Sequence, residues 1–271
     1  MPELPEVETV CRGLAPLLLG RRFTGAIIRN PSLRWPVPAN LDSLIAGRRA
    51  ELLSRRGKYL ILKLDEGNLI IHLGMSGSLR LVRSGGTPAR HDHIDLLLNN
   101  GMCLRYRDPR RFGAVLWCDL PASHPLLSQL GIEPLDTDFN GSWLYADSRG
   151  HRTPIKSWLM DSHRVVGVGN IYANEALFHA GIHPLTQAAK LTRPRCERLA
   201  GAIRDTLNRA IEAGGSTLRD FVDSQGEPGY FQQTYYVYGR AGEPCRACGD
   251  TIRLSRLNNR ATYFCRNCQK K

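Results

Sequence analysis

Apolar residues near the start of the chain recur at the three- and four-residue spacing of one helix face. Val7, Val10 and Leu14 continue this pattern to Leu18, which predicts an amphipathic helix that begins at about Pro5. Proline is favoured in a first helical turn, and acidic residues there complement the positive end of the helix dipole. The chain is therefore expected to enter a helix almost at once.

Between about residues 21 and 120 the pattern changes to short alternating or fully apolar runs separated by Gly, Pro and Asn. Runs of this kind, bounded by turn residues, are typical of β-strands. Eight strands are predicted: Phe23–Arg29, Ala50–Arg56, Tyr59–Leu64, Leu69–Leu73, Ser78–Val82, Ile94–Leu98, Cys103–Tyr106 and Gly113–Trp117. Their short length and regular turns indicate an antiparallel sandwich or barrel.

The second half of the chain returns to helical spacing. Helices are predicted over Ile155–Met160, Asn170–His179 and Arg195–Ala213. A polar stretch before them indicates a hinge between domains. The predicted fold class is therefore α+β and multidomain. It has an N-terminal domain at residues 1–134, a linker at 135–153, a helical domain at 154–236 and a cysteine-rich domain at 237–271.

The chain of 271 residues carries a net charge of +12, and only six of its 37 basic residues are Lys. Such a surplus is usually matched to a polyanion, because cations laid on phosphates release condensed counterions. Nucleic acid is the expected partner, and the alternative is a genome that favours Arg codons. No stretch has the roughly 20 apolar residues of a membrane span, and the acidic start is unlike a signal peptide. A cytosolic protein without membrane contact is expected.

Four of the eight cysteines form the pattern Cys245-x2-Cys248-x16-Cys265-x2-Cys268. This is the spacing of a four-thiolate zinc site, which is closed and therefore structural. We predict one bound Zn²⁺. The last 34 residues hold half of the net charge, so a zinc-stiffened hairpin that carries Arg260 would suit a groove of nucleic acid. The alternative is a clip that only stabilises the tail.

The N-terminus offers a second kind of chemistry. Pro2 is a small residue that permits removal of Met1, which would leave a secondary amine at the start of the chain. An α-amino group has a pKa of about 8, so a useful fraction is neutral at pH 7. Its attack on a sugar C1′ gives a persistent iminium cation, and Glu3 can shuttle protons beside it. The alternative is an ordinary helix start with a capping carboxylate.

Five further features of the sequence are typical of nucleic-acid contacts. Arg55–Lys58 is a basic turn that can hold a phosphate, or a solvated one. Asp108–Phe112 and the glycine-flanked Met75 offer apolar wedges of the kind that fill the gap left by a flipped nucleotide; the alternative for Met75 is a core position. A helix beginning at Asn170 can present its N–H groups to a phosphate, and His91 is more consistent with phosphate contact or solvation than with a metal site.

These segments occur together and in order: Met1–Thr9, Lys58, His72–Gly77, Asp108–Gly113, Gly167–Tyr172 and the four-cysteine segment. In combination they closely resemble the bacterial formamidopyrimidine-DNA glycosylases, bifunctional enzymes of 8-oxoguanine repair. The resemblance covers essentially the whole chain. It implies a DNA glycosylase with AP-lyase activity in base excision repair, acting on oxidised purines in damaged double-stranded DNA.

The resemblance also implies roles for individual residues. Pro2 would be the nucleophile that forms a Schiff base, and Glu3 the general acid/base. Lys58 would donate a proton for β-elimination, and Arg260 would assist δ-elimination. Backbone phosphates would be bound by His91, Arg110, Arg152, Lys156 and Asn170, and the gap left by the everted base would be filled by Met75, Arg110 and Phe112.

The implied architecture is an N-terminal helix plus β-sandwich, a helical domain with a helix–two turns–helix motif around Asn170, and a zinc finger, in a monomer. Arg219 and Arg152 stand where the family commonly has lysine, so a lesion-specific role of an amine at position 219 does not carry over. A pyrimidine-directed enzyme of the endonuclease VIII type is disfavoured by Leu4 and by the gap-filling set. A different class, a zinc protein that binds damaged DNA without cutting it, stays open.

Overall fold

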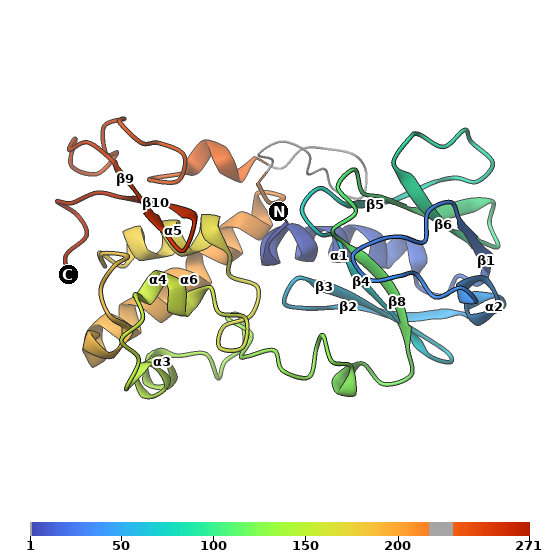
Figure 1. Cartoon of the computed structure of the whole chain (residues 1–271), viewed down its shortest axis with the longest axis horizontal. Coiled ribbons are helices and arrows are strands. Elements are labelled where there is room, and N and C mark those ends of the chain that lie inside the picture. The colour runs from blue at the N-terminus through green and yellow to red at the C-terminus, as the bar shows by residue number, and fades with distance from the viewer. Residues whose placement is uncertain (1, 217–229) are drawn as a thin grey trace. The chain divides into compact units, whose positions relative to one another are not determined.

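The computed structural model describes residues 2–216 and 230–271, which divide into two compact units (Figure 1). Unit 1 contains Met1–Gln129 and Ala213–Tyr230, and unit 2 contains Leu130–Glu212 and Phe231–Lys271. The chain therefore builds unit 1, then most of unit 2, returns to unit 1 for a short segment and ends in unit 2.

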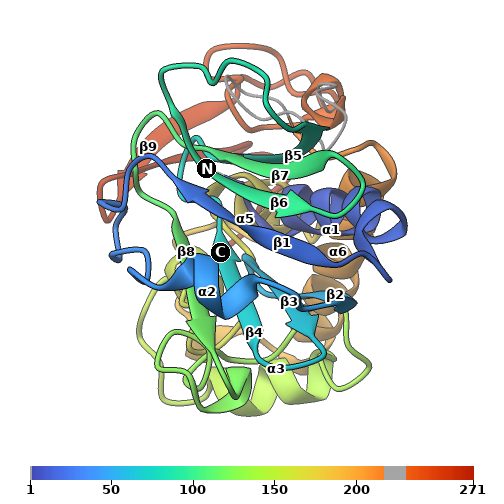
Figure 2. The same ribbon diagram turned by 90° about the vertical axis from the view of Figure 1, so that its right-hand side faces the viewer.

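Unit 1 is built on two four-stranded antiparallel sheets, with strand orders β1-β6-β7-β5 and β2-β3-β4-β8. The strands are β1 (Phe23–Ile28), β2 (Ala50–Arg56), β3 (Tyr59–Leu64), β4 (Asn68–His72), β5 (Ser78–Arg83), β6 (Asp92–Leu98), β7 (Met102–Arg107) and β8 (Ala114–Cys118). The two sheets form separate layers in Figure 2. All eight predicted strands are present, each within two residues of its predicted bounds.

Helix α1 (Leu4–Leu18) contacts β2, β3 and β5, and so touches both sheets. Its buried face includes Val7, Val10 and Leu14, the positions whose spacing predicted the helix. These side chains join one core with residues of both sheets, and each such burial contributes about 1.5–3 kcal/mol. The short helix α2 (Leu41–Ile45) packs on β1, and a 3-10 turn, η1 (Pro121–Ser123), follows β8.

Unit 2 is helical and ends in a small two-stranded sheet. Its elements are α3 (Gly141–Ser148), α4 (Ile155–Leu159), α5 (Asn170–His179), η2 (Ala188–Lys190), α6 (Arg193–Glu212), η3 (Phe231–Thr234), β9 (Arg253–Leu257) and β10 (Arg260–Phe264). Helix α5 packs against α4, α6 and β10. Within the described residues, no helix combines the length and apolar character needed to cross a bilayer.

Helix α3 lies within the segment whose polar composition indicated a hinge. The side chain of Asn140 caps it by accepting a hydrogen bond from the Trp143 backbone N–H, at 2.9 Å. The helix packs against α6, and Trp143 lies 6.0 Å from Trp158, measured between ring centroids. With only eight residues, α3 is too short for a hydrophobic period to reveal it in the sequence.

His72 ends strand β4 in a position that favours its neutral form. Burial lowers the pKa of His72 to about 4, and the positive charges of Lys58 and Arg34 act in the same direction. Its Nδ1 accepts a hydrogen bond from the Gly74 N–H at 3.1 Å, and its carbonyl accepts one from the Tyr106 hydroxyl at 3.0 Å. The neutral ring thus supports the turn that follows β4.

Because the folded-state pKa of His72 lies below its unfolded value of about 6.5, the unfolded chain binds the extra proton first as the pH falls. The stabilisation is fully present above pH 6.5 and is lost toward pH 4, and between pH 7 and pH 5 the loss is at most about 2 kcal/mol. His72→Asn retains an acceptor but does not titrate. It should therefore lose less free energy of unfolding than the native chain over this interval, as measured by denaturant titrations at both pH values. Equal losses would contradict the assignment.

Candidate active site and nucleic-acid interface

The first turn of α1 is buried together with the residues that precede it. Pro2 and Glu3 are both buried, and Glu3 is the N-cap of the helix. The Glu6 carboxylate accepts a hydrogen bond from the Glu3 N–H at 2.7 Å, within a reciprocal capping box. This arrangement satisfies N–H groups that a helix start leaves unpaired, and it fixes the direction in which the chain leaves Pro2.

The same carboxylate holds a segment that is distant in the sequence. Glu6 Oε1 accepts a hydrogen bond from the Ser216 N–H at 2.8 Å, across 210 residues. Gly215 has φ +82°, and a Cβ atom there would lie 3.2 Å from the Glu6 side chain. Glu6 therefore joins the helix start to the segment that returns to unit 1. Arg219 and Met1, which bear on the sequence-based predictions, lie outside the described residues.

Lys58 and Gly57 form the tight two-residue turn between β2 and β3, at which Gly57 has φ +56°. Arg55 donates to Glu8 of α1 at 2.8 Å and to the Gly57 carbonyl at 3.1 Å. Burial alone would raise the pKa of Glu8, but its hydrogen bonds to Arg12 and Arg55 outweigh burial and lower the pKa. An ion pair therefore connects α1 to the turn that carries Lys58.

The two loops with predicted gap-filling residues share one buried carboxylate. Asp108 is fully buried and accepts hydrogen bonds from the Ser76 hydroxyl at 3.0 Å and the Gly113 N–H at 2.9 Å. The Arg110 N–H and the Tyr106 hydroxyl also donate to it, each at 3.3 Å. Asp108 thus holds the loop after β4 and the loop after β7 in one arrangement.

The predicted wedge residues project from these loops. Met75 is 39% and Phe112 43% exposed, so neither side chain is a core residue. The Arg110 guanidinium stacks over the Phe112 ring at 4.8 Å. A Cβ atom at Gly74 would lie 2.6 Å from the backbone of Phe112 and Gly113, so the two loops are in direct contact. The structure therefore brings the loops of all three predicted gap-filling residues together.

His91 lies beside the same loops. Its carbonyl accepts a hydrogen bond from the Asp108 N–H at 3.1 Å, and its ring is 6.2 Å from that of His93. His93 in turn contacts the Asp108 carbonyl through Nε2 at 2.8 Å. A backbone hydrogen bond thus joins His91 to Asp108, two residues before Arg110, the other predicted phosphate contact of unit 1.

The predicted phosphate contacts of unit 2 lie on or before α4 and α5. Asn170 is the first residue of α5, after the N-cap Gly169, and Arg152 is exposed just ahead of α4. Lys156 on α4 is only 1% exposed. Its Nζ donates to the Ala261 carbonyl and to Thr262 Oγ1, both at 2.8 Å. The amine of Lys156 therefore contacts the C-terminal hairpin.

Arg260 begins the second strand of that hairpin and is exposed. Strands β9 and β10 pair from Arg253 opposite Phe264 to Leu257 opposite Arg260. The turn between them is formed by Asn258 and Asn259, both with positive φ, a conformation that asparagine tolerates better than most residues. Arg260 and Lys156 line the same hollow of about 160 Å³.

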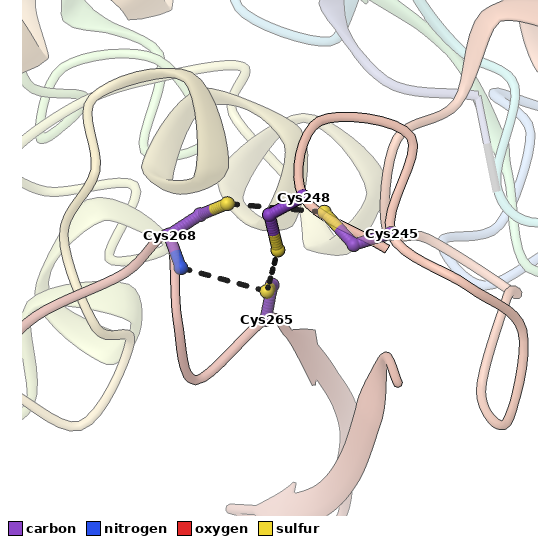
Figure 3. Close-up of side chains that lie close together, drawn as sticks. All are labelled: Cys245, Cys248, Cys265 and Cys268. Atoms are coloured by element: carbon purple, nitrogen blue, oxygen red, sulfur yellow. Dashed lines mark hydrogen bonds between the residues drawn. The ribbon is translucent and has the colours of Figure 1, made fainter. Parts of the chain in front are cut away.

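The four cysteines of the sequence motif converge on one point (Figure 3). All four Sγ atoms lie within 4.8 Å of one another, with Cys245–Cys268 at 3.9 Å and Cys248–Cys265 at 3.5 Å. Tetrahedral Zn–S bonds of about 2.3 Å would place the sulfurs about 3.8 Å apart. The donor set and its spacing fit one structural Zn²⁺.

Three buried residues connect distant segments by hydrogen bonds, and the sequence did not indicate this role. Asp108 was part of a quoted motif, but nothing in that motif indicates that one carboxylate gathers two loops. Asn174 and Glu175 are each 1% exposed. The Glu175 carboxylate accepts hydrogen bonds from three consecutive N–H groups, Tyr236–Tyr238, at 2.8–3.0 Å. The one sequence feature that could have indicated their role is the occurrence of these two polar residues in an otherwise apolar stretch of α5.

Three family descriptions match this chain and together cover most of it. They are the formamidopyrimidine-DNA glycosylase N-terminal domain at residues 1–115, the formamidopyrimidine-DNA glycosylase H2TH domain at 130–222, and the zinc finger found in FPG and IleRS at 242–271. A formamidopyrimidine-DNA glycosylase of Methylococcus capsulatus is 55% identical over 271 residues, with both chains covered completely.

Solved structures agree with this similarity. The MutM (Fpg) protein of Thermus thermophilus superimposes with a TM-score of 0.88 at 40% identity, over 99% of this chain and 98% of that one. Lactococcus lactis Fpg bound to DNA with an abasic site gives a TM-score of 0.91 at 33% identity, over 99% and 100% of the two chains. A variant of that protein bound to Fapy-dG containing DNA gives 0.92 at 34% identity, over the whole of both chains. On sequence, fold and metal-binding cluster alike, the chain belongs to the formamidopyrimidine-DNA glycosylase family.

Proposed function

We propose that the chain is a bifunctional DNA glycosylase/AP lyase that excises formamidopyrimidines and 8-oxoguanine from damaged duplex DNA and cuts the strand at the vacant sugar. The observation that carries this proposal is the buried Pro2 at the positive end of α1. It occurs in a chain similar over its whole length to proteins named for this activity and to structures bound to Fapy-dG and abasic-site DNA.

The first step requires the free amine of Pro2, and therefore removal of Met1. The nitrogen lone pair attacks the sugar C1′, the glycosylic bond breaks, and its electron pair leaves with the damaged base. Glu3, which is next in the chain and buried, is assigned the transfer of protons between the sugar and the departing base. The amine gives up its N–H proton as the C1′–N bond forms, and the C1′–O4′ bond then breaks as O4′ takes a proton, which opens the sugar ring. Because the amine is secondary, the product is an iminium cation with no N–H to lose, which withdraws electrons from the sugar.

Two eliminations follow from this electron sink. Loss of a C2′ proton expels the 3′ phosphate oxygen, and Lys58 is assigned the proton transfer in this β-elimination. Loss of a second proton then expels the 5′ phosphate oxygen. We propose that Arg260 assists this δ-elimination. Water then hydrolyses the Pro2 adduct and restores the amine. Each elimination removes one proton from the sugar and breaks one C–O bond.

DNA is held by groups of both units. Met75, Arg110 and Phe112 are proposed to enter the gap left by the everted nucleotide, an arrangement that the exposure of Met75 and Phe112 supports. Phosphate contacts are assigned to His91, Arg110, Arg152 and Asn170, whereas the amine of Lys156, which was predicted to join them, is buried against the C-terminal hairpin. These groups would fix the position of the duplex, while the wedge acts at the lesion.

We further propose that the protein acts as a monomer in the cytosol. Four cysteines outside the metal cluster, Cys11, Cys103, Cys118 and Cys196, have free thiols, which fits a reducing compartment. Burial raises the pKa of Cys11 to about 11, so this thiol stays protonated and unreactive.

The Schiff base can be trapped. Reduction by borohydride during reaction with abasic-site or 8-oxoguanine DNA should join the DNA covalently to Pro2, as located by mass spectrometry. Protein that retains Met1 is the matched control and should give no adduct, because its proline nitrogen is an amide. A fully processed protein that binds the DNA but forms no adduct and leaves the strand intact would be a damage-binding protein, contrary to this proposal.

Removing the shared anchor of the two loops should weaken base eversion. Asp108→Ala removes the acceptor of the Gly113 N–H and of the Ser76 hydroxyl, and each lost charge-assisted bond costs about 1.5–3 kcal/mol. Excision of 8-oxoguanine should fall by about tenfold or more, and cleavage at a preformed abasic site, where less must be extruded, should fall less. Asp119→Ala, at an exposed position, is the control. Equal losses on both substrates would argue against the wedge.

Metal removal should disable the hairpin that carries Arg260. The protein is expected to hold one zinc per chain, measured by atomic emission, and Cys265→Ser should release it because only three thiolates remain. Chelation should abolish strand cleavage, and added Zn²⁺ should restore it. Cys196→Ser, which alters a buried thiol outside the cluster, should keep its zinc. Full cleavage by metal-free protein would refute a structural role of the ion in the reaction.

A further inference from the structure

Asn174 links the start of α5 to the finger hairpin. Its side chain is 1% exposed and uses both of its polar atoms. Nδ2 donates to the Asn170 carbonyl one turn earlier at 2.6 Å, and Oδ1 accepts from the Tyr263 N–H of β10 at 2.8 Å. One amide therefore spans the proposed phosphate-binding end of the helix and the strand that carries Arg260.

Lys156 reaches the same strand from α4. Its Nζ bonds the Ala261 carbonyl and Thr262 Oγ1 at 2.8 Å each, and Thr262 is fully buried. Next to it, Asn258 of the hairpin turn donates to Ser157 Oγ at 3.1 Å. The hairpin is thus attached to α4 and α5 by polar contacts on residues that lie within three positions of Arg260.

The register of β10 decides where Arg260 points. Side chains alternate along a strand, so Arg260 and Thr262 lie on one face. Thr262 packs against Lys156 on that face, and Arg260 and Lys156 border one hollow, together with Ser157, Met160 and Asp161. A shift of β10 relative to α4 would therefore move Arg260 directly.

We propose that Asn174 and Lys156 are positioning residues that hold β10 so that Arg260 stands in a fixed relation to Asn170. This inference deepens the proposed function and rests on it. Asn170, the proposed phosphate contact at the start of α5, and Arg260, the residue assigned to the δ-elimination, are thereby held in one rigid arrangement. Reacting groups displaced by about 1 Å can lose about 100-fold in rate. Because Arg260 is assigned only to the δ-elimination, loss of these contacts should slow that step selectively.

The experiment follows both eliminations on DNA with a preformed abasic site. Asn174→Leu fills the same space without polar atoms and should slow δ-elimination by about 10- to 100-fold, with the β-elimination rate within about twofold of the native enzyme. Asn174→Asp, which keeps an acceptor for the Tyr263 N–H, should recover part of the δ rate. Asn208→Leu, at an exposed position on α6, should change neither rate. Parallel loss of both eliminations, or an unchanged δ rate in Asn174→Leu, overturns the proposal.

Lys156 is tested separately by the salt dependence of DNA binding. If its amine positions the hairpin, Lys156→Met lowers the δ rate and leaves the slope of log affinity against log salt unchanged. If the amine mainly contacts a phosphate, the slope falls by about one and the ratio of the two eliminations does not change, which overturns its assignment as a positioning residue. Zinc content of each variant verifies the finger. Native protein that cleaves no abasic DNA would instead refute the proposed function.

Discussion

The carboxylate of Glu6 is the constraint on which the proposed chemistry of unit 1 depends. It is almost completely buried and accepts hydrogen bonds from the Glu3 N–H and the Ser216 N–H. Burying a carboxylate is costly unless donors surround it, so these two segments must meet whenever the helix start is packed. The direction of the chain at Pro2 is thereby set by an interaction that Pro2 itself does not make.

In unit 2, too, buried polar side chains hold distant segments of the chain by hydrogen bonds to their backbone. Two polar side chains of α5 bind distant backbone groups: Glu175 accepts hydrogen bonds from Tyr236–Tyr238, and Asn174 accepts one from β10. Burial raises the pKa of Glu175, and the three N–H groups that it accepts act in the opposite direction. The metal cluster folds the finger locally, whereas these side chains determine where the finger is attached to the helices.

Elements were predictable from the sequence where local signals were strong. Gly and Asn between short apolar runs located all eight strands of unit 1, and the glycines at positions 169 and 181 bounded α5. The metal cluster followed from cysteine spacing alone. Helix α3 was not predictable, because its eight residues carry no hydrophobic period. Contacts such as Glu6–Ser216 were not predictable either, because a hydrogen bond across 210 residues leaves no trace in local pattern. The roles assigned to individual site residues remain predictions.

The sharing of Asp108 by two loops has a mechanical consequence. Ser76 and Gly113 belong to different loops but donate to one fully buried carboxylate, so neither loop can move far without breaking the anchor of the other. Met75 and Phe112 would therefore enter or leave a base stack as one stiff body. In the proposed reaction, a wedge of this stiffness would enter a weakly stacked base pair more readily than a sound one.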